Sequence, residues 1–238
     1  MRKNFTLLLA FALFYTTGNT QQKKFKHYEF GGEGGLTIDY LNIKDPDDYI
    51  RSSHYLTSGL GGPKLRRYWS EKWFTEAAIL FKENTFGIRL RNGSDVTFND
   101  SKIVMIPIRA GIKWKLSPKL NLSLITGVAP TFTQIFQDGS SGINYPGEIS
   151  LTYAKRDNYK KTYVTVQSGV HLSHLIKKRI SLETGLNYYM GFNTVETTDV
   201  NYTTNNGISN NAEIIRKGSF INYNLGVAYI FDLKSKIR

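Results

Sequence analysis

The stretch 104–116, VMIPIRAGIKWKL, has an apolar residue at every even position, whereas its odd positions include Arg109, Lys113 and Lys115. A period of two is the pattern of a β-strand whose two faces meet different surroundings. Arg109 lies in the middle of the stretch. The second face must therefore accommodate charge far from the strand ends.

The same alternation recurs along the chain. It predicts eight strands, at 28–42, 72–81, 85–96, 102–116, 120–136, 161–175, 180–196 and 217–234. The predicted tight turns are Lys82–Asn84, Ser117–Lys119 and Ile176–Arg179, the long loops are 43–71, 137–160 and 197–216, and 97–101 is intermediate. In an up-and-down barrel every second connection lies at the same end. The pattern predicts an all-β fold, an eight-stranded antiparallel up-and-down transmembrane β-barrel with short periplasmic turns and long extracellular loops.

The position of Arg109 favours a membrane barrel over a soluble one. A lipid-facing Arg near the bilayer midplane costs about 2–4 kcal/mol, so Arg109 is expected to point inward and its apolar neighbours outward. The predicted strands are long enough to cross a bilayer, which takes about 9–11 tilted residues. Aromatic residues also recur near the strand ends, as interfacial girdles require. A secreted soluble ligand-binding barrel remains an alternative, with the same apolar rows lining a cavity.

The amino end has the pattern of an export signal. Met1–Lys3 is basic, the next residues to Tyr15 are almost all apolar, and small polar residues follow up to Thr20. This pattern predicts a signal peptide over 1–20 and a barrel domain over 21–238. The apolar run is about half the length that a transmembrane helix needs. An outer-membrane location in a bacterium is therefore expected.

Composition excludes several classes of protein. The 238 residues are 40% hydrophobic and 13% aromatic, which is too apolar for a disordered chain. There is no cysteine, so disulfide scaffolds, thiol catalysis and cysteine-bound metals are excluded. The formal net charge is +12. Nucleic-acid binding is not expected, because the positive residues are scattered over turns and the termini and form no basic stripe with interleaved aromatics.

The polar strand faces predict a filled interior. In an eight-stranded barrel the lumen is just wide enough for side chains to fill it. Opposite charges on these faces are therefore expected to pair across the lumen and to leave no open pore. The residues predicted to form this structural ion-pair network are Glu33, Glu76, Arg89, Arg109, Lys113 and Glu183.

Chemistry-bearing motifs are sparse. His171, Ser173 and Glu183 are the one catalytic set that can be assembled, and they leave open an alternative function as an outer-membrane lipid A-modifying enzyme. The expected function is non-enzymatic, with no cofactor and no metal. The expected partners are outer-membrane lipid and lipopolysaccharide, the outer-membrane assembly machinery and a protein that docks on the loops. The surface-loop residues proposed for such contacts are Tyr55, Arg66, Arg67, Tyr68 and Trp69.

Two stretches carry a family resemblance. Residues 104–111, with Pro107 inside an aliphatic strand, and residues 122–130, with Thr126-Gly127, resemble a family of small outer-membrane β-barrel proteins of Bacteroidetes-type bacteria. That family is related to PorT, an accessory barrel of type IX secretion. The resemblance implies an eight-stranded barrel inserted by the outer-membrane assembly machinery, with no shared catalytic residues. It also raises an accessory role in protein secretion.

Overall fold

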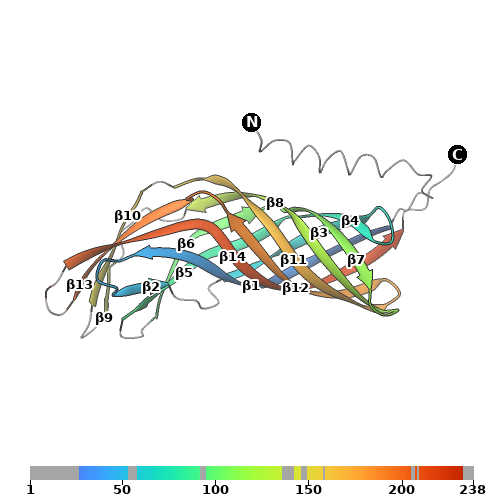
Figure 1. Cartoon of the computed structure of the whole chain (residues 1–238), viewed down its shortest axis with the longest axis horizontal. Coiled ribbons are helices and arrows are strands. Elements are labelled where there is room, and N and C mark those ends of the chain that lie inside the picture. Colours follow the sequence, from blue (N-terminus) through green and yellow to red (C-terminus); the bar gives the residue numbers. More distant parts are fainter. Residues whose placement is uncertain are drawn as a thin grey trace.

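A computed structural model describes residues 27–52, 58–91, 95–135, 142–145, 149–157, 159–204, 207 and 209–232. These residues form one antiparallel sheet that closes on itself as a long, tilted barrel (Figure 1). Within them, no helix is long and apolar enough to cross a bilayer. The predicted signal peptide and its cleavage site before Gln21 lie outside the described residues.

Eight strand units make the closed ring. In chain order they are β1 (His27–Lys44), β3 (Ser58–Tyr68), β4 (Trp73–Ala78) continued by β5 (Leu80–Leu90), β6 (Asp95–Met105) continued by β7 (Ile108–Lys115), β8 (Leu120–Ile135), β11 (Thr162–Lys177), β12 (Ile180–Gly191) and β14 (Ser209–Asp232). The ring closes because β14 pairs with β1 from His27 opposite Asp232 to Lys44 opposite Glu213. The predicted eight-stranded up-and-down barrel is confirmed.

Two predicted boundaries were wrong. Residues 58–68, assigned to a long loop, form β3, which pairs with both β1 and β4. Glycines and a proline at 59–63 break the alternation there and hid the strand. The predicted turn Lys82–Asn84 lies inside β5, because Lys82 points into the lumen to reach Asp39. The prediction missed β3 and counted the unit formed by β4 and β5 as two strands. These two errors cancel, so the predicted number of eight strands is still correct.

The predicted long loops are largely strands. β2 (Ile50–Ser52), β9 (Gly142–Tyr145), β10 (Ile149–Asp157) and β13 (Glu196–Thr204) lie at the loop end, together with the far ends of β1, β5 and β14. We call this part the loop-end extension. It projects at the left of Figure 1, opposite the tight turns and the start of β1. The barrel wall thus continues beyond the loop positions that the sequence pattern suggested.

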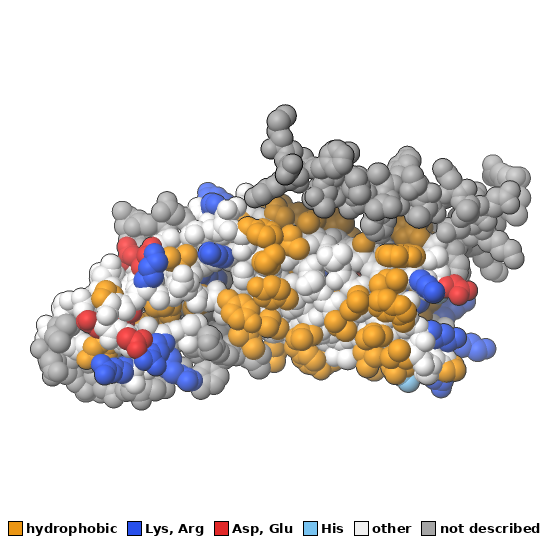
Figure 2. Space-filling view, in the orientation of Figure 1, with side chains coloured by type: hydrophobic (Ala, Val, Ile, Leu, Met, Phe, Trp, Pro, Cys, Tyr) orange, Lys and Arg blue, Asp and Glu red, His pale blue; other side chains and the backbone are white. Residues whose placement is uncertain are grey.

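The outer surface of the barrel carries an apolar belt. Figure 2 shows hydrophobic side chains gathered over the middle and the turn end, with charged side chains beyond them at both ends. Belt residues include Phe30, Leu36, Tyr40, Leu65, Ile108, Leu124, Val128, Phe132, Val164, Leu186, Phe192, Tyr223, Leu225, Val227 and Tyr229. From Phe30 to Tyr40, ten residues at about 3.3 Å each and a tilt of about 40° span about 25 Å, the height of the lipid-facing band of membrane barrels. This surface suits lipid contact.

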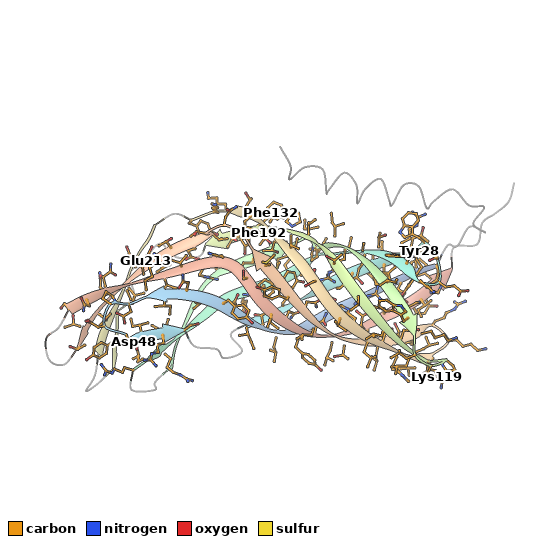
Figure 3. The ribbon with its side chains drawn as sticks, viewed as in Figure 1. Tyr28, Asp48, Lys119, Phe132, Phe192 and Glu213 are labelled. Carbon is orange, nitrogen blue, oxygen red and sulfur yellow. The ribbon has the colours of Figure 1, made fainter. Side chains whose placement is uncertain are left out.

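The extension has the opposite arrangement. Its interior is an apolar cluster formed by Ile50, Ile88, Leu90, Val200, Tyr202, Ala212 and Ile214, against which Leu41, Ile43 and Tyr49 pack. Its outward side chains include Lys44, Asn201, Asn211 and Glu213. Figure 3 places Asp48 and Glu213 in this part and Tyr28 and Lys119 at the other end. The extension therefore resembles a water-soluble β-structure joined to a membrane barrel.

Candidate functional site: an ionic network in the lumen

The centre of the lumen is organised around Arg109. Arg109 on β7 is the register partner of Glu76 on β4, and both side chains are fully buried. The guanidinium donates to Glu76 Oε1 over 2.6 Å, to Glu33 Oε1 over 2.8 Å and to Gln167 Oε1 over 2.9 Å. It also donates to the Tyr189 hydroxyl over 3.1 Å. One arginine therefore links strands on opposite sides of the barrel.

Two cations from β3 extend this centre. Arg66 donates from Nε to Glu76 Oε2 over 2.8 Å, and its Nη2 lies 2.8 Å from Glu183 Oε2. Arg66 Nη1 donates to Glu29 Oε2 over 3.2 Å. Lys64 forms ion pairs with Glu33 and Glu183. Each carboxylate of the group thus meets at least one cation.

His171 completes the group on β11. Its Nδ1 lies 2.8 Å from Glu183 Oε1 and its Nε2 lies 2.9 Å from Asn187 Oδ1. Its register partner is Gly185, where an added Cβ would lie 2.6 Å from the imidazole ring. The ring therefore fits only because residue 185 has no side chain.

A chain of hydrogen bonds connects Arg109 to the surroundings of the His171 ring. Arg109 can only donate, so Gln167 accepts with Oε1 and donates from Nε2 to Asn187 Oδ1, over 3.0 Å. Asn187 Oδ1 is thus an acceptor, as is the Glu183 carboxylate on the other side of the ring. Both ring nitrogens therefore lie against oxygen atoms of other side chains, and neither is free for a further partner.

We call this set the lumen network: Glu29, Glu33, Lys64, Arg66, Glu76, Arg109, His171 and Glu183. Its four carboxylates meet three permanent cations, and His171 lies against the carboxylate of Glu183. Desolvating several charges is costly, and hydrogen-bonded pairing offsets that cost. Because removing one partner leaves another charge buried without compensation, the set behaves as a single unit.

Apolar and ionic layers close the lumen on both sides of the network. Tyr68, Phe74 and Ile125 cluster at the turn end. On the other side Tyr189 stacks on Phe220 at a centroid distance of 4.3 Å, within a cluster that includes Leu80 and Met105. Beyond this cluster the buried pairs Lys82–Asp39 and Arg216–Glu196 precede the apolar core of the extension. The cavity beside Lys82 and Asp39 measures about 10 Å³, room for one water.

The structure brings together four of the six residues predicted for the network, namely Glu33, Glu76, Arg109 and Glu183. Arg89 does not join them, because it lies in the loop-end part of β5 opposite Arg51 and between the buried Ile88 and Leu90, so its side chain is on the outward face. Lys113 lies near the turn end, half-buried, with its ammonium 4.0 Å from the centre of the Tyr68 ring. The sequence pattern missed Lys64 and Arg66, since both belong to the unrecognised strand β3.

The surface-loop assignments need correction. Arg66 and Tyr68 are buried, 2% and 1% exposed, and Tyr68 donates to Glu29 inside the lumen. The prediction that they contact partners at the surface was wrong, because β3 alternates and its even residues point inward. Arg67 and Trp69 are outward and stack on each other, 3.7 Å from guanidinium to ring, but next to the turn between β3 and β4. Tyr55 lies outside the described residues.

The histidine set that the sequence offered for catalysis has an unsuitable geometry. Ser173 is the register partner of Glu183, while both nitrogens of His171 are already bound to Glu183 and Asn187. No ring nitrogen is left to take a proton from Ser173, as a general base would have to. In the described part of the chain, no group of three or more acidic or histidine side chains could hold a metal ion.

Comparisons with known proteins show the fold. No family model and no curated protein sequence matches the chain. The outer membrane protein OprG from Pseudomonas aeruginosa is similar in structure, with a TM-score of 0.52 and 11% identity, over 90% of this chain and 100% of that one. Neisserial surface protein A follows with a TM-score of 0.47 and 10% identity, over 86% and 97%. A major outer membrane protein from Thermus thermophilus has a TM-score of 0.45 and 11% identity, over 86% and 98%. The chain has the fold of the small outer-membrane β-barrel proteins.

Proposed function

We propose that this protein is a non-enzymatic, integral outer-membrane barrel with a closed lumen. It acts by presenting its loop-end extension outside the membrane for structural, adhesive or partner-docking contacts. The observation that carries this proposal is the change of polarity along single strands. The wall is apolar outside and ionic inside over the belt, then polar outside and apolar inside over the extension. A wall built in this way suits contact with lipid over the belt and with water over the extension.

The filled lumen supports a role other than diffusion. Over the described residues, aromatic, ionic and apolar layers succeed one another along the axis. Eight-stranded barrels have room for side chains and little else. The purified protein should give no conductance steps in planar bilayers, measured beside a known porin. Stable, open steps would contradict the closed lumen.

The membrane placement is tested by fractionation. The full chain should be recovered in the outer-membrane fraction of its own bacterium. It should also migrate faster on a gel before boiling than after, as closed barrels do. Recovery in the soluble periplasmic or secreted fraction would overturn the membrane placement and leave the soluble barrel. This experiment needs no knowledge of a partner.

The rigid extension supports a contact role. Its wall is hydrogen-bonded and its interior packed, so outward side chains such as Asn201 and Asn211 are held in place. A photo-crosslinking residue at Asn201 or Asn211 in living cells should give a discrete adduct that is absent with the same residue at Leu225 in the belt. Identical adduct patterns at the three positions, or adducts at Leu225 alone, would contradict docking on the extension.

The enzymatic alternative has its own test. A lipid A-modifying enzyme would change the acyl pattern of lipid A, so mass spectra from cells with and without the gene should be identical under our proposal. A reproducible change would replace the non-enzymatic interpretation. The bound state of both His171 nitrogens supports the expectation of no change.

The resemblance to the PorT-related barrels of Bacteroidetes-type bacteria is part of the proposal. It rests on residues 104–111 and 122–130, in which Pro107 lies at the break between β6 and β7. Within that family the chain would depend on the outer-membrane assembly machinery and could serve protein secretion. Loss of the gene should then reduce the proteins secreted to the medium, by quantitative proteomics, without loss of other barrels from the membrane. An unchanged secretome would remove the secretion role.

A further inference from the structure

Three neighbouring strand units change course at one level of the barrel wall. β12 ends at Gly191 and β13 begins at Glu196, while β11 begins at Thr162, a few residues after β10 ends. Lys160 N donates to Val195 O over 2.8 Å, and Val195 N donates to Arg216 O over 2.7 Å. In β14, Gly218 has a φ of +73°. The interruptions in the three units are therefore held side by side.

A depression of about 350 Å³ lies at this level, at the boundary between the belt and the extension. Two lysines, Lys160 and Lys217, contribute to its lining together with Thr162 and Asn193. Val164 and Phe192 supply apolar lining and are 55% and 60% exposed. Gly191 keeps the wall tight beside it, since an added Cβ would lie 1.5 Å from Lys217 O. Figure 3 shows Phe192 and Phe132 at this boundary.

The lysines of the depression lie apart from the acidic side chains that the structure describes. Neither Lys160 nor Lys217 has an ion-pair partner among the side chains that the structure describes. Glu196 is engaged with Arg216 inside the wall, and Glu213 pairs with Lys44 further along the extension. Two lysines without an acidic partner among the described side chains therefore line the same depression as two exposed apolar side chains.

We infer that this depression binds the phosphorylated headgroup of an outer-leaflet lipid, with its acyl chains against Val164 and Phe192. Ammonium groups form charge-assisted hydrogen bonds with phosphate oxygens. Basic residues at a membrane surface attract anionic headgroups with about tenfold or smaller gains per residue. Apolar side chains just below match the acyl region. This inference rests on the proposed membrane placement and names a lipid class and its site.

The test measures lipid binding by the folded, full-length protein in detergent. Lipid A is titrated into the wild type and into Lys160→Gln/Lys217→Gln, with binding followed by native mass spectrometry. Lys115→Gln/Lys119→Gln, which removes two exposed charges at the turn end, is the matched control. The first variant should weaken binding about 10- to 30-fold relative to the control. Phe192→Ala should weaken it several-fold.

Two probes identify the bound group. Dephosphorylated lipid A should bind the wild type weakly and show no difference between the variants, and inorganic phosphate alone should fail to compete at millimolar concentration. Equal binding by both lysine variants, or equal binding of phosphorylated and dephosphorylated lipid, would overturn the site. Effective competition by inorganic phosphate would make it a site for free phosphate. Gel mobility before boiling shows that each variant is folded, so a negative result here is distinguishable from failure of the membrane placement.

Discussion

The membrane part and the loop-end extension of this barrel share strands but have opposite interiors. In β14 the even residues point inward throughout: Asn222 and Asn224 are buried in the membrane part, and Ala212 and Ile214 in the extension. The odd residues run from Tyr223 and Leu225 in the belt to polar Asn211 in the extension. The strand thus determines whether a side chain points inward or outward. Whether the outward side chains are apolar or polar depends on whether lipid or water surrounds that part of the wall.

Replacing Arg109 should cause the largest loss of stability, because its side chain is at the centre of the ion pairs inside the membrane part. Arg109→Met leaves Glu33 and Glu76 buried with reduced compensation, so the free energy of unfolding should fall by about 3–5 kcal/mol. The measurement is urea unfolding in lipid bilayers, followed by tryptophan fluorescence. Adding Glu76→Leu should recover part of the loss. A loss below about 1 kcal/mol would mean that the network is not a coupled unit.

A cavity in the extension should act locally. Ile214 has no exposed surface, and Ile214→Ala should cost about 2–4 kcal/mol through lost burial and the space left behind. Ile215, half-buried on the other face of the same strand, gives the matched control Ile215→Ala, with a smaller loss. Limited proteolysis should cut the Ile214→Ala extension while the barrel keeps its gel mobility. If the variant lost both the protease resistance of its extension and the gel mobility of its barrel, the two parts would unfold together.

The outward faces can be compared with one substitution at two sites. Leu225 lies opposite Gly34, near the middle of the belt, and Asn211 lies on the same face of β14 in the extension. Leu225→Arg should cost about 2–4 kcal/mol, since it places a charge in lipid, whereas Asn211→Arg should be close to neutral. Unfolding in bilayers measures both. Equal effects would place the belt boundary elsewhere.

A smaller effect is expected from Tyr202, which donates to Asp45 over 2.7 Å in the extension. Burial, followed by the hydrogen bond to Asp45, raises the pKa of Tyr202 above its ordinary value. A raised pKa means that deprotonation favours the unfolded state. This contribution to stability is therefore full below about pH 10 and is lost as the pH rises above it. Tyr202→Phe should cost about 1 kcal/mol at pH 7 and flatten this dependence, measured by proteolysis of the extension. An unchanged pH dependence would exclude Tyr202 as its source.

The accuracy of prediction from sequence depended on how regularly apolar and polar residues alternate in each segment. The alternation around Arg109 was strong enough to predict its strand, its inward direction and the fold class. Glu33, Glu76 and Glu183 were placed in the lumen on the same ground. β3 was missed because glycines and Pro63 break the alternation. Lys64 and Arg66, which lie on β3, were therefore not predicted as members of the lumen network. Arg89 was included wrongly, because its neighbours Ile88 and Leu90 are the inward residues there: over the extension the apolar face of a strand points inward and the polar face outward, the reverse of the belt.

The extension shows the second limit. Residues 197–216 have the composition of a polar loop, because a wall in water has polar outward residues that resemble loop composition. Pairing of β13 with β14 in register, and the apolar cluster inside, became visible only when the strands were assembled. Neither the pairing nor the cluster has a local signature, since their members come from distant parts of the chain.

By itself, the order of residues determined the periodicity of the strands, their amphipathic faces and the need for charge to lie inside a lipid-facing wall. The folded chain alone decided which charges meet, where the apolar belt stops and that three strand units bend together beside Lys160 and Lys217. The reason is physical: alternation is a property of neighbours in sequence, whereas pairing across a lumen depends on register and tilt, which every strand of the closed ring sets jointly.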